Sequence, residues 1–237
     1  MDDKVLNQLV EKLQKAFGDR LVSVVLYGSA ADGDHHAKYS DFNVLCVLTA
    51  ITPRELAEST AIFRWWRELG SPAPLLLTEH EVATSTDCFA IEFIDIQHQH
   101  RMLHGKDIVS SLVIDRSFYR AQVEHDLRAK LLRLRQKASG MLSDADLLRR
   151  LLVDSISTFC VLFRHALALS GVVVTARKRE IIERARDQFG IDAAPFERLL
   201  EIREERVKPR EVEPVALLAE YLEGVGKVID AVDRLEK

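Results

Sequence analysis

The chain has few cysteines, and their spacing predicts no disulfide or metal motif. Its 237 residues include three cysteines, Cys46, Cys88 and Cys160, which lie far apart in the sequence. An odd number of scattered cysteines without a CxxC pair argues against a disulfide framework and against the common zinc-binding spacings. We therefore expect reduced thiols in a cytoplasmic protein, with Cys46 and Cys160 as small residues of the core.

The sequence also lacks long apolar runs and a strong excess of charge of one sign. No stretch reaches the ~20 uninterrupted apolar residues of a membrane span. The N-terminus becomes amphipathic after four residues, which predicts no signal peptide. The 33 basic and 37 acidic side chains give a formal net charge of -4. This balance argues against a surface devoted to nucleic acid, and we expect no membrane partner.

Two apolar segments between residues 21 and 48 have polar residues at their adjoining ends. The second segment opens with Asp41, Phe42 and Asn43. Because side chains alternate across a strand, Asp41 and Asn43 should point to one place, while Phe42 and Val44 point into the opposite layer. A carboxylate and an amide would then face a common ligand.

The first segment stops at Gly28 and Ser29. A glycine lets the backbone approach a ligand closely, because it has no side chain. The amides that follow Gly28, together with the Ser29 hydroxyl, are placed to donate hydrogen bonds to an anion such as phosphate. The pair therefore predicts a nucleotide-binding turn.

This arrangement, Gly28-Ser29 followed by Asp41-Phe42-Asn43, resembles the nucleotidyltransferase superfamily. That superfamily includes DNA polymerase beta and the aminoglycoside nucleotidyltransferases, and its signature is Gly-Ser, a short spacer, then Asp-x-Asp or Asp-x-Glu on the next strand. In the family the Gly-Ser pair holds the nucleotide phosphates, and the paired carboxylates bind divalent metal ions. The resemblance implies that Ser29 contacts phosphate and that Asp41 is a catalytic residue and a ligand of Mg²⁺.

The acidic motif departs from that pattern at two places. Asn43 is a neutral ligand where the family has a second carboxylate, although two hard cations need negative oxygens to hold them. The expected third acid is missing from residues 73–77, which read Ala-Pro-Leu-Leu-Leu. Glu92 could replace it as a catalytic residue if residues 89–96 form a strand beside the other two. The alternative is that Glu92 and Asp95 lie at the solvated rim of an edge strand.

The pattern of apolar residues changes near residue 112. Before it, helical and strand-like segments alternate, and after it only helical periodicity remains. We predict an α+β protein, with a nucleotidyltransferase-like mixed sheet and flanking helices in residues 1–112 and a helical bundle in residues 113–237. The expected helices cover residues 4–17 and 53–70, a short segment after Thr78, and about 116–139, 143–170, 175–189, a segment from 195, and 214–235. The expected strands cover residues 22–26, 41–48, 75–77 and 89–96.

Three further features each have two interpretations. On the helix over residues 116–139, Lys130 and Arg133 belong to a basic row that could reach nucleotide phosphates, or to a solvated face where Asp126 pairs with Lys130. The histidines at 98, 100 and 104 could bind a transition metal, although a polar strand end and loop fits better. Trp65 could stack on a base or lie at the margin of the core.

Two functions follow from the sequence. The first is an enzyme that transfers a nucleoside monophosphate from a nucleoside triphosphate to a hydroxyl, with Mg²⁺ held by Asp41 and Asn43. Its acceptor is a small molecule or a macromolecule. The second is a module on the same fold that binds nucleotide or protein without transfer chemistry.

Overall fold

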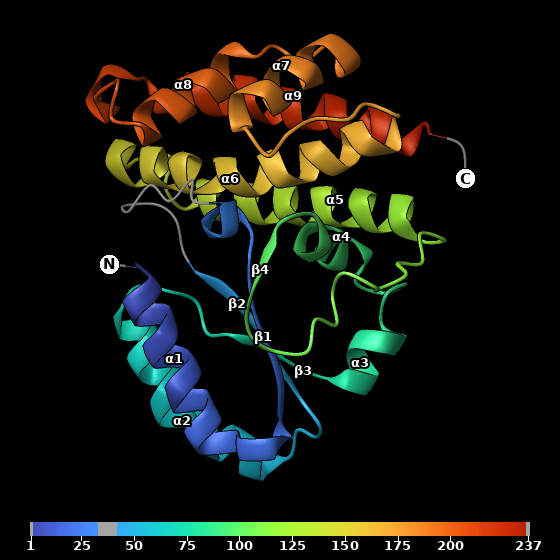
Figure 1. Cartoon of the computed structure of the whole chain (residues 1–237). Helices are drawn as coiled ribbons and strands as arrows, with labels where there is room; N and C mark the ends of the chain where they lie inside the picture. Colours follow the sequence, from blue (N-terminus) through green and yellow to red (C-terminus); the bar gives the residue numbers. More distant parts are fainter. Residues whose placement is uncertain (1, 33–41, 236–237) are drawn as a thin grey trace. The chain divides into compact units, whose positions relative to one another are not determined.

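The computed structural model describes residues 2–32 and 42–235 (Figure 1). The chain forms two compact units, Met1–Phe118 and Tyr119–Lys237. A four-stranded mixed sheet with flanking helices makes up the first unit, and helices make up the second. The predicted α+β class, with a mixed sheet followed by C-terminal helices, is confirmed.

The sheet has the strand order β3-β2-β1-β4. Its strands are β1 (Leu21–Tyr27), β2 (Asn43–Leu48), β3 (Leu75–Thr78) and β4 (His100–Gly105). β1 is antiparallel to β2 and to β4, whereas β2 and β3 are parallel. The end of β1 therefore meets the beginning of both β2 and β4. Tyr27 is the residue at this meeting point, because it pairs with Asn43 on one side and His100 on the other.

Helices α1 (Asp2–Phe17) and α2 (Pro53–Glu68) cover one face of the sheet (Figure 1). Their apolar stripes pack on alternate residues of β1 and β2, as expected for amphipathic helices on a sheet. The fully packed residues of this layer include Leu9 and Leu13 of α1, Val24 and Leu26 of β1, Val44 and Cys46 of β2, and Trp66 of α2. The predicted helices over residues 4–17 and 53–70 and the core position of Cys46 are confirmed.

The other face carries α3 (Glu79–Thr84) and α4 (Ala90–His98). The strand predicted over residues 89–96 is wrong, because all of these residues except the N-cap Phe89 lie in α4. Phe93 and Ile96 are buried three residues apart, so one helical face packs on Val25, Leu45 and Val47 of the sheet while Glu92 stays exposed. A short apolar run fits a buried strand or a buried helix equally well, which explains the error. The fourth strand is β4, nearer the C-terminus.

The start of α2 carries a charged capping network. Thr52 and Glu55 form a capping box, with Pro53 at the first helical position. The Glu55 carboxylate accepts hydrogen bonds from the backbone amide and the hydroxyl of Thr52. It also forms an ion pair with Arg20, which comes three residues after the end of α1. These bonds, led by that of the Thr52 hydroxyl, lower the pKa of Glu55 from 4.5 to about 2. Glu55 therefore ties the beginning of α2 to the end of α1.

Glu55→Gln should make the stability of the first unit less dependent on pH. A carboxyl whose pKa is lowered on folding stabilises the protein above its ordinary pKa, and this contribution is lost as the pH falls through the folded pKa. For Glu55 the loss spans pH 4.5 to about 2. We expect the variant to be less stable at pH 7 and to lose less stability on acidification, as measured by urea unfolding at pH 7 and pH 3. Glu68→Gln, an exposed change on the same helix, is the control; equal pH dependence in both variants would contradict the network.

Five α-helices build the described part of the second unit. They are α5 (Tyr119–Ser139), α6 (Ala145–Leu169), α7 (Lys178–Phe189), α8 (Ala194–Arg203) and α9 (Pro214–Asp233). α6 contacts each of the other four and buries residues on several sides, as its nearly continuous apolar surface predicts. By length and composition alone α6 could cross a membrane, but half of its most apolar window is buried within the protein. It is the core helix of this bundle.

Four aromatic rings meet at the centre of the bundle. Phe159 and Phe163 of α6 contact Tyr221 of α9 and Phe196 of α8, and the shortest centroid distance, 4.9 Å, joins Phe196 and Tyr221. Phe196 also lies against Gly224 of α9, where there is no side chain. The close approach of α8 and α9 therefore depends on a glycine.

Candidate functional site

Gly28 forms a tight turn at the end of β1. Its φ of +77° lies in the left-handed region that favours glycine. Its amide donates to the carbonyl of Gln99, with an N–O distance of 3.0 Å, and its own carbonyl accepts from the amide of Ala31 at 2.9 Å. The chain then continues as a single 3-10 turn, Ser29–Asp32. The turn predicted at Gly28 and Ser29 is present, and their contact with phosphate stays a prediction.

Asn43 lies directly beside this turn. It pairs with Tyr27 across β1 and β2, and a methyl group on Gly28 would lie 3.4 Å from the Asn43 Nδ2 atom. Two of the predicted site residues, Gly28 and Asn43, are thus brought together by the antiparallel pairing. Asp41, the predicted catalytic residue and metal ligand, lies outside the described residues.

The side chains at the start of β2 divide between the two faces of the sheet. The ring of Phe42 lies 5.9 Å from that of Trp66 in α2, and Val44 belongs to the same core layer. The prediction that Phe42 and Val44 point into one layer is confirmed. Because side chains alternate along a strand, Asn43 points to the opposite face of the sheet. Leu45 lies on that same face, and α4 packs on it.

The α4 helix brings two carboxylates close to the same point. Glu92 and Asp95 are three residues apart, so they share one face of the helix. Burial raises the pKa of the Tyr27 hydroxyl, and the negative charges of Glu92 and Asp95 raise it further. These carboxylates therefore act on the residue that pairs with Asn43. Glu92 reaches the neighbourhood of the predicted site from a helix, and its catalytic role stays a prediction.

Tyr27 is the residue of this site that sequence reasoning missed. It is the last residue of β1 and precedes Gly28, and its ring packs against the core layer under α4. The available signal was a side chain with a polar tip at the end of an otherwise apolar strand. A tyrosine hydroxyl is protonated near neutral pH and can donate a hydrogen bond, and the raised pKa of Tyr27 extends this state to higher pH.

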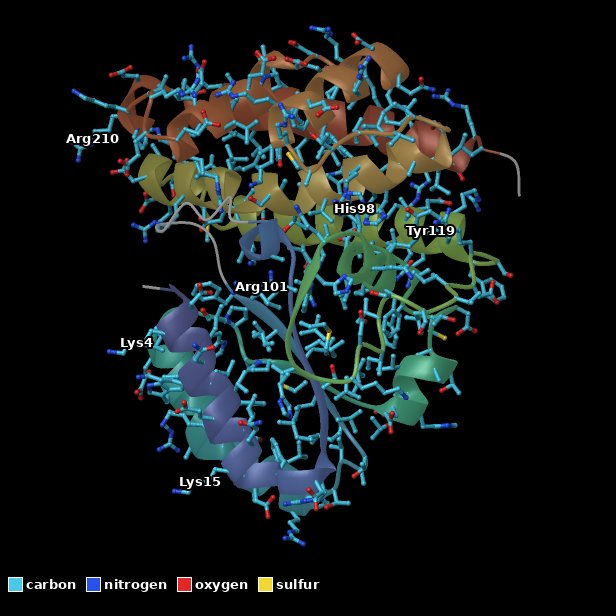
Figure 2. All side chains as sticks on the ribbon, in the orientation of Figure 1. Lys4, Lys15, His98, Arg101, Tyr119 and Arg210 are labelled. Carbon is cyan, nitrogen blue, oxygen red and sulfur yellow. The ribbon has the colours of Figure 1, made fainter. Side chains whose placement is uncertain are left out.

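The histidines after α4 do not converge on a metal. His98 ends α4 (Figure 2), His100 is 3.3 Å from the carbonyl of Gln97, and His104 is 3.1 Å from Nε2 of Gln14 in α1. A register shift in the pairing of β1 with β4 separates the two strand histidines. Within residues 2–32 and 42–235, no three His, Cys, Asp or Glu side chains form a group that could hold a metal ion.

The predicted phosphate-binding cations belong to the second unit. Lys130 and Arg133 are both exposed on α5. Their exposure fits the alternative, a solvated face with ion pairs within the helix, and Arg128 pairs with Glu124 on this helix. The pair given as an example is replaced, because the Asp126 carboxylate lies 3.1 Å from the ring of His125. Nucleotide binding by Lys130 and Arg133 stays a prediction.

Comparison with known proteins identifies the fold. The sequence matches no family model and no curated protein. A solved structure of spectinomycin adenyltransferase AAD(9) from Enterococcus faecialis, with ATP and spectinomycin, matches with a TM-score of 0.57. The match covers 98% of this chain and 99% of that one, at 13% sequence identity. The chain has the nucleotidyltransferase fold.

The turn after β1 and the start of β2 can now be compared with the site expected for this fold. In the nucleotidyltransferase fold predicted from Gly28-Ser29 and Asp41, the turn after the first strand and the start of the second form one site. Here the same two places are adjacent through the pairing of Tyr27 with Asn43. At 13% identity the likeness concerns the fold, so the chemistry has to be argued from the residues.

Proposed function

We propose that this protein is a nucleotidyltransferase that transfers a nucleoside monophosphate from a nucleoside triphosphate to a hydroxyl group of an acceptor. The observation that carries the proposal is that Asn43 lies beside the Gly28 turn, where it pairs with Tyr27, on a fold shared with an adenyltransferase whose structure holds ATP. A glycine turn and a polar strand start are the two parts that nucleotide binding needs there.

The residues at this end of the sheet fit Mg²⁺ better than a softer metal. Asn43 offers an amide oxygen, and Asp41, two residues earlier in the sequence, would add a carboxylate. Oxygen ligands of this kind suit Mg²⁺, which binds few protein groups and takes further ligands from water and phosphate. When bound, Mg²⁺ would neutralise charge on the phosphates during transfer.

The protein's own groups have separate tasks in this reaction. The turn at Gly28 and Ser29 would bind the phosphates, and the exposed Lys130 and Arg133 are candidates for further phosphate contacts. The acceptor oxygen would attack the α-phosphorus as diphosphate leaves. Glu92 is the candidate base for the hydroxyl proton, and the effect of its negative charge on Tyr27, the partner of Asn43 across β1 and β2, supports this role.

The small number of carboxylates at the site favours a second candidate function. Asn43 is neutral, and β3 (Leu75–Thr78) carries no acid. A site with fewer carboxylates holds divalent cations more weakly. The second candidate is therefore a protein that binds nucleotide or a protein partner on this fold without transferring a nucleotidyl group.

Asp41→Ala should remove metal-dependent nucleotide binding. We expect the gain in ATP affinity on adding Mg²⁺ to fall by about tenfold or more, because a charged metal ligand is lost. Isothermal titration calorimetry with ATP, and then with the other nucleoside triphosphates, with and without Mg²⁺, measures this change. Asp19→Ala, which removes an exposed carboxylate near the opposite end of β1, is the matched control.

Asn43→Asp tests whether the site needs a second carboxylate. Mg²⁺-dependent binding in the wild type that Asp41→Ala removes would support a working metal and nucleotide site and justify a search for the acceptor, whose nucleotidylation would identify the enzyme. Binding that appears only in Asn43→Asp would support the second candidate, because the geometry would be intact and the charge missing. Equal Mg²⁺-dependent affinity in the wild type and in Asp41→Ala would overturn the proposed site.

A further inference from the structure

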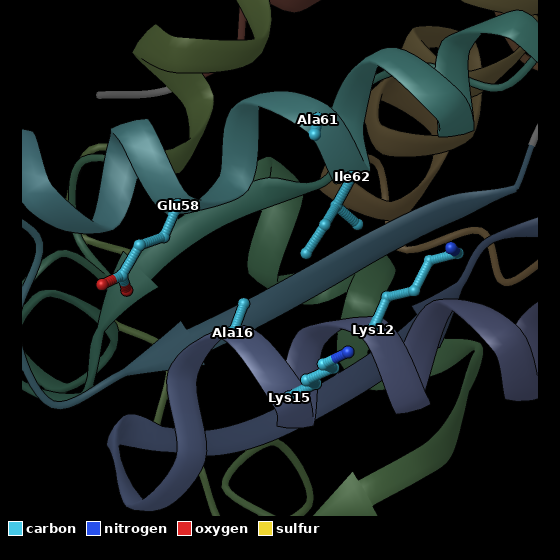
Figure 3. A pocket seen from close by; sticks show the side chains of 6 residues that line it. All are labelled: Lys12, Lys15, Ala16, Glu58, Ala61 and Ile62. Atoms are coloured by element: carbon cyan, nitrogen blue, oxygen red, sulfur yellow. The ribbon is translucent and has the colours of Figure 1, made fainter.

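A groove of about 430 Å³ runs between α1 and α2 on the outer side of the first unit (Figure 3). We call it the α1–α2 groove. It is lined by Lys12, Lys15 and Ala16 of α1 and by Glu58, Ala61 and Ile62 of α2. These helices cover the face of the sheet opposite to Asn43, so the groove is separate from the nucleotide site proposed above.

The floor of the groove is apolar because its central residues are small or buried. Ala16 and Ala61 carry only a methyl group where the two helices face each other, and Ile62 points between the helices (Figure 3). Longer side chains at the alanine positions would fill this space. The floor therefore offers apolar surface to a ligand without hydrogen-bonding groups of its own.

Among the described residues, the one carboxylate that lines the groove, that of Glu58, already has two cationic partners. Glu58 accepts hydrogen bonds from Arg20 at 2.7 Å and from Arg54 at 2.9 Å. Both bonds, that of Arg54 first, lower the pKa of Glu58, so it remains ionised and matched by two guanidinium groups. Glu58 therefore leaves the two lysines of the groove without a carboxylate partner in it.

The two ammonium groups are the free charges of the groove. Among the described side chains, neither Lys12 nor Lys15 forms an ion pair. The Lys12 ammonium lies over the ring of Trp65, 4.9 Å from its centroid, which holds that cation at the groove. Lys15 projects outward from α1 (Figure 2). On a chain of net charge -4 this is a local site of positive charge beside an apolar floor.

We propose that the α1–α2 groove binds a small amphiphilic anion, namely a carboxylate on an alkyl or aryl body. The two ammonium groups fit the carboxylate, and Ala16, Ala61 and Ile62 fit the apolar body. A polyphosphate fits less well, because the neighbouring Arg20 and Arg54 are occupied by Glu58. Trp65 packs at the margin of the core, as one of its two interpretations predicted, with the Lys12 ammonium over its ring.

Titration with anilinonaphthalene sulfonate, an aryl anion that fluoresces in apolar surroundings, tests the groove on the full chain. Decanoate should displace the dye, and decylamine, with the same tail and the opposite charge, should not. We expect Lys12→Gln/Lys15→Gln to raise the dissociation constant by about tenfold, because both cations are lost. Lys4→Gln/Lys106→Gln is the control, since it removes the same charge outside the groove and should leave binding unchanged.

Ala61→Leu tests the floor independently of charge. Position 61 is exposed and leucine is a good helix former, so the helix should fold while the larger side chain fills the groove. We expect the displaceable dye signal to be lost. The proposal is overturned if Ala61→Leu or the double lysine variant binds like the wild type, if decylamine displaces the dye as well as decanoate, or if inorganic triphosphate displaces it better.

Discussion

Gly105→Ala should destabilise the first unit by about 4 kcal/mol or more, a size reserved for severe backbone clashes and lost packing. A methyl group at this position would lie 2.1 Å from the carbonyl oxygen of Val22 and 3.2 Å from the Cα of Ser23. Both atoms belong to the backbone of β1 and cannot rotate away. Gly105 also has a φ of +79°, which an alanine adopts only with strain. Urea unfolding followed by circular dichroism measures the loss.

Gly70→Ala separates the clash from the strain. Gly70 has a φ of +91°, but a methyl group there would meet no atom within 4 Å. We expect this control to cost about 1 to 2 kcal/mol, the strain of a left-handed residue alone. If Gly105→Ala costs no more than Gly70→Ala, β4 does not approach β1 as closely as described.

Gly224→Ala should destabilise the second unit by about 2 to 3 kcal/mol, as expected for overpacking of a core. The added methyl group would lie 2.6 Å and 2.8 Å from two ring atoms of Phe196. Phe196 is completely buried and contacts the rings of Phe163 and Tyr221, so it has no free space to move into. Thermal unfolding followed by circular dichroism measures the effect.

Gly226→Ala is the matched control on the same helix. A methyl group at Gly226 would meet no atom within 4 Å. Because alanine favours a helix over glycine by about 1 kcal/mol, we expect this variant to be as stable as the wild type or more stable. A loss of stability of similar size in both variants would show that the two glycines share a property of α9, and the contact with Phe196 would not be the cause.

The sequence predicts the first unit well where local signals agree. Capping boxes at Thr52 and Thr78 mark the starts of α2 and α3, and both are present. The apolar runs over β1 and β2 predict the central strands, and the Gly-Ser pair predicts the turn between them. These features depend on residues close together in the chain, so a single sequence contains them.

The parts that the sequence could not predict depend on contacts between distant residues. Residues 89–96 fit a strand or a helix until their packing on Val25 and Leu45 is known. The place of Tyr27 in the site follows from its pairing with Asn43 and from the charges on α4. The α1–α2 groove follows from two alanines on separate helices, which no local pattern connects.

The central position of β1 has a consequence for how the first unit is made. β1 is an early segment of the chain, yet its second neighbour in the sheet is β4, whose last residue is Gly105. During synthesis the sheet therefore stays incomplete until the ribosome has released the chain beyond residue 105, and one edge of β1 is unpaired meanwhile. Such distant pairing slows folding, whereas the helices of the second unit form from neighbouring residues. We therefore expect the second unit to fold faster than the sheet of the first unit, although it is synthesised later.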